Sequence, residues 1–480
     1  MSSELGIKSK KSDFSNWFSE VCSKADLVDL RYNVQGFVVH KPWAMRMIKH
    51  IYAIFEAELE RRGHEPVLFP LVIPEENLER EKEHVAGFKP EVFWITKAGE
   101  EELPRKLALR PTSETAFYQM YSLWIRSYRD LPLKLYQSVA VYRYESHTRP
   151  FLRGREFLWI EAHDAFATHE EALRQIREDM EICEEVIWKR LGIPFRFLKR
   201  PEWDKFAGAD ATYAADTIMP DGKVNQISST HDLGQRFAKA FNITYVDESG
   251  KENYVWQTCF GPGIWRIVAA LIAIHGDDKG LVLPFEIAPI QVVIVPIFYS
   301  EEERKEVVDF CKEVEQMLKA NAIRCKVDLR DETPGFKFND WELRGVPLRI
   351  EIGPRELKER YVMLVRRDSG ERIESKLDGL VAEIKKLSEE ILENLKRRAV
   401  ESFEQRIAKA EDREEVAKAL NGGKVVYMPF CGREECAREL QEVTGGGKVR
   451  GTELEPKKAS GRCAWCGEKA KEWVYVAKAY

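Results

Sequence analysis

The stretch YRYESHTRPFLRGREFLWIEAH, residues 142–163, decides how the rest of this chain is interpreted. It predicts two strands joined by a loop that holds three arginines, Arg149, Arg153 and Arg155. Side chains alternate along a strand, so Arg143 and Glu145 are expected on one face. An arginine there can hold a phosphate or carboxylate through two hydrogen bonds, and the glutamate can accept from an exocyclic amine. The stretch predicts a nucleotide site, although a hairpin with a solvated basic turn would carry the same residues.

Two further segments place charged side chains at the start of an apolar helix. LRPTSETAFY (109–118) puts Thr112 and Glu114 in a turn before a helix, a pattern that an ordinary capping signal also explains. QTCFGPGIWRIVAALIAIHGDDKGLVLP (257–284) leads from glycines into an apolar helix that carries one charge, Arg266. A buried arginine is costly unless an anion pairs with it, so Arg266 is either an anion ligand or a side chain that reaches the surface.

The surrounding pattern predicts an α+β catalytic domain with a largely antiparallel sheet. Residues 42–62 have apolar side chains at helical spacing, and EPVLFPLVIP (65–74) is strand-like. Pro70 indicates a sheet edge or a strand end, because proline cannot donate to a ladder. Further apolar strands follow between loops, namely VFWIT, KLYQSVAVYRYE, EFLWIEAHDAFA and TYAADTIMP.

Near residue 285 the pattern changes to alternating strands and helices, which predicts an α/β domain. A long charged helical stretch over about 380–420 then leads to a tail that carries four cysteines. We expect three domains, at residues 1–284, 285–385 and 386–480, the last a small zinc-binding α+β domain.

The tail predicts a structural zinc site. Cys431 and Cys436 form a C-x4-C pair, and Cys463 and Cys466 form a C-x2-C pair. Two close pairs of this kind are typical of tetrahedral Zn²⁺, and a site of four cysteines leaves no position open for chemistry. The alternative is four unrelated thiols.

Composition limits the class of protein. The net charge of −5 over 480 residues excludes a global polycation, so any nucleic acid must bind local basic patches. No apolar run is long enough to cross a membrane, and the N-terminus has no signal-peptide pattern. Five of the nine cysteines occur singly, which favours reduced thiols in a cytosolic protein.

These segments, in this order, resemble the signature motifs of class II aminoacyl-tRNA synthetases. EPVLFP resembles motif 1, YRYE…RGREF motif 2, and GPGIWR…HGD motif 3. With RPTSET, HDLGQRF, RGVPLRIEIGP and the four cysteines, the chain is identified as a member of the prolyl-tRNA synthetase family, in its archaeal and eukaryotic form. The resemblance implies that L-proline is activated with ATP and transferred to tRNA(Pro), by a cytoplasmic homodimer that motif 1 assembles.

The resemblance also assigns the nucleotide residues. Arg143 would bridge the ATP α-phosphate and the proline carboxylate, and Arg266 and Arg153 would grip the outer phosphates with Mg²⁺. Glu145 would read the adenine amine and Phe157 would stack on the ring. Two polar residues would touch the nucleotide or its magnesium, Gln226 and Ser229. Motif 3 differs from the family pattern, because Ile264 stands where a small hydroxyl residue is usual.

For proline, the resemblance implies that Glu114 and Thr112 bind the ammonium while His231 lies near the ring. The walls would be Phe88, Trp159 and His163, with Glu161 beside them. In the α/β domain, Glu342, Arg349 and Arg355 would read the two guanines of proline anticodons, although a charged sheet edge would carry the same residues. The terminal Tyr480 would pack back toward the catalytic domain.

Three alternatives remain to be compared with this assignment. Threonyl-tRNA synthetase keeps a catalytic zinc with a cysteine ligand ahead of motif 2, yet no cysteine occurs between Cys22 and Cys183. A non-catalytic synthetase-like protein usually loses motif arginines, whereas Arg143 and Arg266 are present. A zinc-dependent nucleic-acid-binding module leaves the first 280 residues unexplained.

Overall fold

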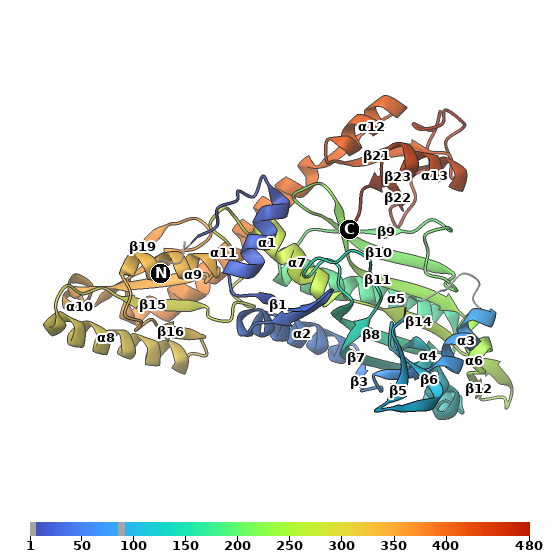
Figure 1. Ribbon diagram of the computed structural model, residues 1–480, viewed down its shortest axis with the longest axis horizontal. Coiled ribbons are helices and arrows are strands. Elements are labelled where there is room, and N and C mark those ends of the chain that lie inside the picture. The colour runs from blue at the N-terminus through green and yellow to red at the C-terminus, as the bar shows by residue number, and fades with distance from the viewer. Residues whose placement is uncertain (1–5, 85–91) are drawn as a thin grey trace.

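The computed structural model describes residues 6–84 and 92–480, and its largest unit is a seven-stranded sheet (Figure 1). In sheet order the strands are β3 (Glu65–Pro66), β7 (Leu133–Tyr142), β8 (Glu156–Phe166), β14 (Trp256–Phe260), β11 (Val224–Gly234), β10 (Ala211–Ile218) and β9 (Arg196–Lys199). Neighbours run antiparallel, apart from the parallel pair β3–β7. The predicted antiparallel sheet is confirmed.

Three helices, α2 (Pro42–Arg61), α5 (His169–Cys183) and α7 (Ile264–His275), pack on this sheet. Of the 12 residues of α7, all but Arg266 and Ile274 are buried. A helix that is apolar all round must be enclosed on every side, so α7 lies in the core of the domain. Helix α1 (Phe14–Lys24) and the hairpin β1 (Val28–Val34) and β2 (Phe37–His40) precede α2.

A smaller sheet pairs β4 (Val72–Pro74), β6 (Glu101–Leu109) and β5 (Trp94–Ala98) beside the main one. Pro70 was expected at a sheet edge or a strand end, but it lies in neither strand, because the strand-like segment 65–74 forms only the short strands β3 and β4. The remaining elements here are α3 (Glu75–His84), α4 (Glu114–Trp124), α6 (Arg236–Phe241), β12 (Thr244–Val246) and β13 (Glu252–Tyr254).

A five-stranded sheet lies at the left of Figure 1, at the other end of the molecule from the seven-stranded sheet. Its strand order is β16 (Cys325–Val327), β15 (Val292–Pro296), β17 (Leu348–Ile352), β18 (Tyr361–Arg366) and β19 (Arg372–Lys376). The first three strands are parallel and the other pairs antiparallel. The helices are α8 (Glu301–Ala320), α9 (Pro334–Leu343) and α10 (Pro354–Glu359), so the predicted strand–helix alternation is confirmed.

The helical stretch predicted over about 380–420 is interrupted. Helix α11 (Leu380–Gln405) ends, and β20 (Ile407–Lys409) then pairs in parallel with β21 (Val425–Phe430). Asp412 starts a new helix, α12 (Arg413–Asn421), by accepting from the Glu415 N–H at 2.9 Å. Pairing with a distant strand therefore overrides the helical pattern. The last unit is completed by α13 (Glu434–Val443), β22 (Lys448–Gly451) and β23 (Glu472–Ala477).

Among the helices that the structure describes, none is both long and apolar enough to cross a membrane.

Candidate active site

A cavity of about 520 Å³ lies where the end of β7, the start of α4 and the first turn of α7 meet over the large sheet. It is lined by every predicted nucleotide and proline residue in the described part of the chain: Thr112, Glu114, Arg143, Glu145, Arg153, Phe157, Trp159, Glu161, His163, Gln226, Ser229, His231 and Arg266. Phe88 lies outside the described residues.

Three arginines, Arg143, Arg153 and Arg266, line this cavity together with glutamates whose charges act on them. Arg153 Nη1 lies 3.0 Å from Glu145 Oε2, and Arg266 Nη1 donates to the Gln226 carbonyl at 3.3 Å. Burial, and then the charges of Arg153 and Arg143, lower the pKa of Arg266 to about 10. Like charges held together at such a site indicate a binding partner that carries several negative charges.

Arg143 is positioned between an oxygen and two aromatic rings. Its Nε donates to the Pro111 carbonyl at 3.0 Å, and its guanidinium lies 5.5 Å from the Phe157 ring centre and 5.2 Å from that of Trp159. These contacts fix the plane of the guanidinium, and among the described residues its terminal nitrogens make no hydrogen bond or ion pair.

The sequence predicted that Arg143 and Glu145 share one face of a strand, but both residues follow the end of the strand. Strand β7 ends at Tyr142, and only the Arg143 N–H, which donates to the Arg155 carbonyl at 3.0 Å, extends the ladder further. Both side chains nevertheless line the cavity, because the turn after β7 keeps them on its inner side. At Gly154 in this loop, an added Cβ would lie 2.5 Å from the Trp265 ring, so glycine lets the loop pack against α7.

Glu161 occupies the deep end of the cavity and is fully satisfied by protein donors. It accepts hydrogen bonds of 2.8–3.2 Å from Gln137 Nε2, the Ser113 N–H, His163 Nε2 and Thr112 Oγ1. Burial opposes its ionisation, but the bonds from His163 and Ser113 outweigh it and lower the pKa of Glu161 to about 2. Glu161 is therefore a charged group that orients its neighbours.

Glu114 lies close by but, unlike Glu161, has a carboxylate oxygen without a hydrogen-bond donor. Its side chain is 2% exposed, and its Oε2 has no hydrogen-bond partner within residues 6–84 and 92–480. Burial raises the pKa of this carboxyl, while His163 and a hydrogen bond with Cys259 lower it in part. A buried acceptor without a donor costs free energy in the free protein, which indicates that a ligand supplies the donor.

The capping interpretation of RPTSET is wrong for its side chains. Helix α4 does begin at Glu114, but Ser113 makes no side-chain cap. Its hydroxyl instead accepts from Gln137 Nε2 at 2.7 Å. The segment thus serves the cavity more than the helix start.

His231 is held neutral on the far wall. Its Nδ1 contacts Thr212 Oγ1 at 2.9 Å and its Nε2 contacts Ser229 Oγ at 3.1 Å. Burial lowers the pKa of His231 to about 3, so the ring adds no positive charge to the cavity.

Ile264, the departure in motif 3, is fully buried at the start of α7, while Arg266 reaches the cavity.

The sequence did not reveal Arg200, which also lines the cavity and donates to Gln226 Oε1 at 2.9 Å. Both oxygens of Asp216 accept from Arg200, at 2.8 and 3.0 Å. The available signal was Asp216 itself, a carboxylate inside the apolar run TYAADTIMP that needs a cationic partner.

Comparison with known proteins assigns the family. Models of the tRNA synthetase class II core domain (G, H, P, S and T), the anticodon binding domain and the prolyl-tRNA synthetase C-terminal domain match residues 93–275, 291–387 and 413–480. A proline–tRNA ligase from Thermofilum pendens is 68% identical over 483 residues, covering 100% of each chain. The chain belongs to the prolyl-tRNA synthetase family.

Other relatives of this prolyl-tRNA synthetase agree. A proline–tRNA ligase from Pyrococcus abyssi is 47% identical over 98% of each chain. The crystal structure of prolyl-tRNA synthetase from Cryptosporidium parvum, complexed with halofuginone and AMPPNP, matches with a TM-score of 0.93, at 35% identity and 100% coverage of both chains. The predicted activity is confirmed: the enzyme is a class II proline–tRNA ligase that activates proline with ATP and charges tRNA. The threonyl and non-catalytic alternatives are set aside.

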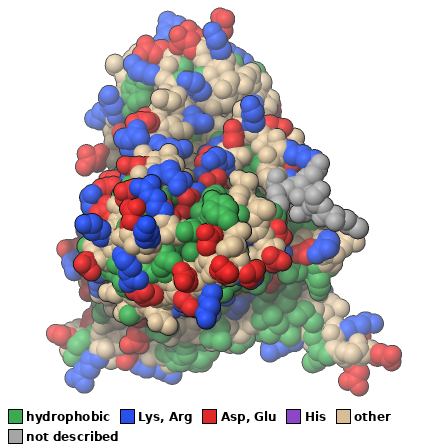
Figure 2. Space-filling model, turned by 90° about the vertical axis from the view of Figure 1, so that its left-hand side faces the viewer, with side chains coloured by type: hydrophobic (Ala, Val, Ile, Leu, Met, Phe, Trp, Pro, Cys, Tyr) green, Lys and Arg blue, Asp and Glu red, His purple; other side chains and the backbone are tan. Residues whose placement is uncertain are grey.

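The predicted anticodon residues of the synthetase fall into two places. Glu342 and Arg349 lie together, with Arg349 Nη1 3.2 Å from Glu342 Oε1 and its guanidinium 4.1 Å from the Phe338 ring centre. Arg355 lies on α10 with a side chain that is 70% exposed, and it pairs with Glu359. Figure 2 shows basic and acidic side chains intermixed on this end of the molecule, so that face has no field of one sign.

The four tail cysteines converge as predicted. All their sulfurs lie within 4.8 Å of one another, and two Sγ–Sγ distances are 3.9 Å (Cys436–Cys463) and 3.7 Å (Cys466–Cys431). Sulfurs around tetrahedral Zn²⁺ are roughly 3.8 Å apart, given a Zn–S bond of about 2.3 Å. The cluster therefore fits zinc.

The prediction for the terminal residue is confirmed. The Tyr480 N–H donates to the Val224 carbonyl of β11 at 3.2 Å, and its hydroxyl donates to Asp221.

Proposed function

We propose that the cavity of this synthetase binds ATP across its arginine cluster and proline at Glu114, so that Arg143 lies between the two ligands. Arg143 then bridges the α-phosphate and the proline carboxylate and stabilises the charge that develops as the carboxylate attacks the α-phosphorus and the bond to the departing pyrophosphate breaks, which leaves prolyl-adenylate. No general base is needed, because the carboxylate is itself the nucleophile. Positioning and electrostatics therefore supply the rate enhancement.

Nucleotide binding exchanges one internal contact for several external ones. Arg153 and Glu145 neutralise each other in the free protein. ATP would separate them, with Glu145 accepting from the adenine amine and Arg153 joining Arg266 on the outer phosphates. Phe157 supplies the stacking surface beside Arg143. Mg²⁺ bound with the nucleotide would add positive charge at those phosphates, and we assign the contacts to the nucleotide or its magnesium to Gln226 and Ser229, which line the cavity.

Proline binding satisfies the group that the free protein leaves unsatisfied. The secondary ammonium donates to Glu114 Oε2, with Thr112 beside it. The neutral ring of His231 and the side chains of Trp159 and His163 would wall the pyrrolidine. We assign Glu161 an orienting role, because its contacts hold Thr112 and His163 in place.

The unpartnered Glu114 oxygen facing a cluster of arginines in one cavity carries this proposal. It is tested by ATP–pyrophosphate exchange with each of the twenty amino acids. Strong exchange with proline, and loss of that exchange in Glu114→Gln at normal ATP affinity, supports the assignment. Exchange that is as strong in Glu114→Gln as in the wild type contradicts it.

The rest of the molecule fits the tRNA-dependent step. We propose domains at residues 1–284, 285–385 and 386–480, in which Glu342, Arg349 and Arg355 of the second contact the anticodon of tRNA(Pro). A guanine edge would displace Arg349 from Glu342. In the third domain Zn²⁺ held by the four cysteines braces the fold and takes no part in chemistry.

Two observations support a homodimer and a cytoplasmic location, one for each. Apolar side chains around motif 1 are exposed, including Leu68 at 79% and Leu123 at 53%, as expected for a face that a second copy covers. None of the nine cysteines forms a disulfide in the structure, which suits a reducing compartment. Equilibrium sedimentation of the wild type and of Leu68→Asp tests the dimer: a monomeric variant supports it, and a monomeric wild type contradicts it.

A further inference from the structure

Helix α7 connects two regions that the proposed function treats separately. Its first turn carries Arg266 in the cavity, and the loop Asp277–Lys279 follows its other end. Twelve residues of helix place these ends roughly 18 Å apart, at about 1.5 Å per residue. Because nearly all of α7 is buried in close-packed core, displacement of one end is transmitted to the other.

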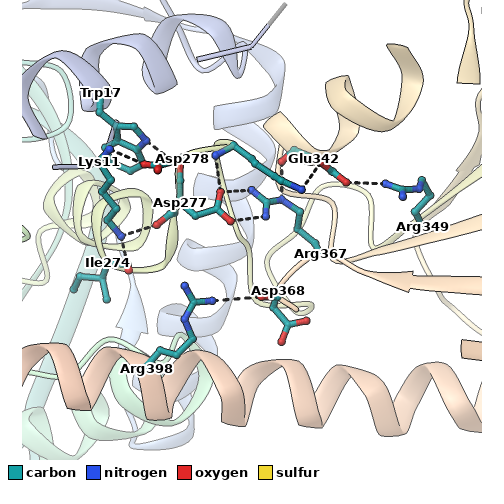
Figure 3. A network of polar contacts seen from close by, with 12 residues as sticks. Lys11, Trp17, Ile274, Asp277, Asp278, Glu342, Arg349, Arg367, Asp368 and Arg398 are labelled. Carbon is teal, nitrogen blue, oxygen red and sulfur yellow. Dashed lines mark hydrogen bonds and ion pairs between the residues drawn. The ribbon is translucent and has the colours of Figure 1, made fainter. Parts of the chain in front are cut away.

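The end of α7 is fixed on the catalytic side, as Figure 3 shows. Lys11 donates through Nζ to the carbonyls of Ile274, at 3.0 Å, and Gly276, so a cation caps the helix C-terminus. The Lys11 N–H also donates to Asp278 Oδ1 at 2.8 Å. Trp17 Nε1 donates to the Asp277 carbonyl at 2.9 Å.

On the side of the anticodon-binding domain, the same loop is joined to Glu342 in two ways, through Arg367 and directly through Lys279 (Figure 3). Arg367 donates to both Asp277 oxygens, at 2.6 and 2.7 Å, and through Nε to the Glu342 carbonyl at 2.8 Å. Lys279 Nζ reaches Glu342 Oε2 at 3.3 Å. The Glu342 backbone and carboxylate are thus both bound, directly or through Arg367, to the loop that ends α7.

The two contacts differ in strength. The Arg367 side chain is 4% exposed and forms a bidentate pair, which makes it a firm connection. Lys279 is 67% exposed, and an exposed pair of this kind is weak because solvent screens it. A guanine that takes the Glu342 carboxylate can therefore displace Lys279 while the Arg367 connection persists.

We propose that Arg367 is a positioning residue, through which occupancy of the Glu342 surface by an anticodon is transmitted along α7 to the catalytic cavity. This inference rests on the anticodon role of Glu342 proposed above. Lys279 and the anticodon compete for the Glu342 carboxylate, so binding of tRNA changes the position of the loop. A change in the position of the loop changes the binding free energy of tRNA in return.

The test compares Arg367→Lys with Arg366→Lys. Lysine can still pair with Asp277 but cannot also hold the Glu342 carbonyl through a planar fork. Arg366 is a matched control, because its side chain is 8% exposed and bidentate to Asp368, and its other partners are Glu371 and Glu390 instead of Asp277 or Glu342. Proline-dependent pyrophosphate exchange without tRNA, tRNA charging, and thermal unfolding are measured for each variant.

We expect Arg367→Lys to keep exchange within about twofold of wild type while kcat for charging falls about tenfold at a nearly unchanged KM for tRNA. Arg366→Lys should leave kcat for charging near wild type. A parallel fall of exchange and charging, equal effects of the two variants, or unaltered charging by Arg367→Lys would overturn the proposal.

Combination with Glu342→Gln separates this inference from the anticodon assignment. If Glu342→Gln impairs charging and its effect largely disappears in the Arg367→Lys background, the relay is supported. Effects that simply add overturn the relay alone. No effect of Glu342→Gln overturns the anticodon role and the relay together.

Lys279→Met provides a second variant on an exposed site: it should lower the KM for tRNA by freeing Glu342, and a raised KM contradicts the competition.

Discussion

Arg450 of the C-terminal unit binds Asp216 of the catalytic sheet through two hydrogen bonds, of 2.8 and 2.9 Å. The same carboxylate accepts from Arg200, which in turn donates to Gln226 in the cavity. Burial opposes ionisation of this acid, but the two arginines hold the pKa of Asp216 well below its usual range. A residue of the C-terminal unit therefore supports the wall of the cavity that we propose binds ATP.

Arg450→Met should weaken both the fold and ATP binding. Removal of one partner from a buried charge network costs about 3 kcal/mol of unfolding free energy, and Arg200 loses the arrangement that aims it at Gln226. Urea unfolding and the KM for ATP in pyrophosphate exchange measure the two effects. Arg413→Met is the control, because Arg413 is 49% exposed and pairs with Glu439 on the surface of the same unit. Equal effects of the two substitutions would contradict the role of Arg450.

Arg143→Ala should abolish adenylate formation, since its guanidinium is the proposed bridge between the reacting groups. Loss of a charge-stabilising donor typically costs about 10²–10³ in kcat. Pyrophosphate exchange with proline provides the measurement. Arg149→Ala is a matched loop variant, because Arg149 packs on the rings of Phe14 and Phe18 and donates to the Ser15 carbonyl, outside the cavity. Exchange by Arg143→Ala within tenfold of wild type would contradict its role.

Glu114→Gln should weaken proline binding without lowering stability. The amide keeps the shape of the side chain but cannot neutralise an ammonium, so the KM for proline should rise about 100-fold, within the range for lost buried charge pairs. The free protein should unfold at the same or a higher temperature, because a buried, partly unsatisfied carboxylate has been removed. A large drop in melting temperature would show that Glu114 is structural.

Much of this site could be predicted because its signals are local. Arg143 and Glu145 stand two residues apart, and Arg266 follows glycines at the start of an apolar helix. Asp216 shows the limit of such reasoning. Its arginine partners lie 16 and 234 positions away in sequence, and nothing local to Asp216 selects them from the other arginines.

The fold was predictable to the same degree and for the same reason. The period-two strands and the strand–helix alternation are properties of short windows, and both are confirmed. The break after α11 depends on pairing between Ile407 and Val425, which is a tertiary contact. The satisfied state of Glu161 likewise depends on Ser113 and Gln137, donors from two other segments, which the residues next to Glu161 in the sequence did not indicate.

Cys463→Ser should release zinc and loosen the C-terminal unit. Structural zinc sites contribute folding free energy directly, so loss of one of four ligands should lower both the metal content and the melting temperature. Metal analysis of purified protein gives the first readout and thermal unfolding the second. Cys311→Ser serves as the control, because Cys311 is buried in the five-stranded domain far along the chain from the cluster. Unchanged zinc content in Cys463→Ser would refute the four-cysteine site.

Stability should fall in mild acid partly through Glu161. Its folded-state pKa is about 2, against an ordinary value of 4.5, so its contribution is complete above the ordinary value and is lost as the pH falls toward 2. At pH 4 the loss from this one group is about 0.8 kcal/mol, because the unfolded chain is already largely protonated there. Glu161→Gln has no carboxyl to titrate, so its free energy of unfolding should fall less between pH 6 and pH 4 than that of the wild type, by this amount. Urea titrations at the two pH values give both differences. Equal pH dependence in the two proteins would mean that Glu161 is not held ionised by Ser113 and His163, and its assigned role in orienting the proline site would fail with it.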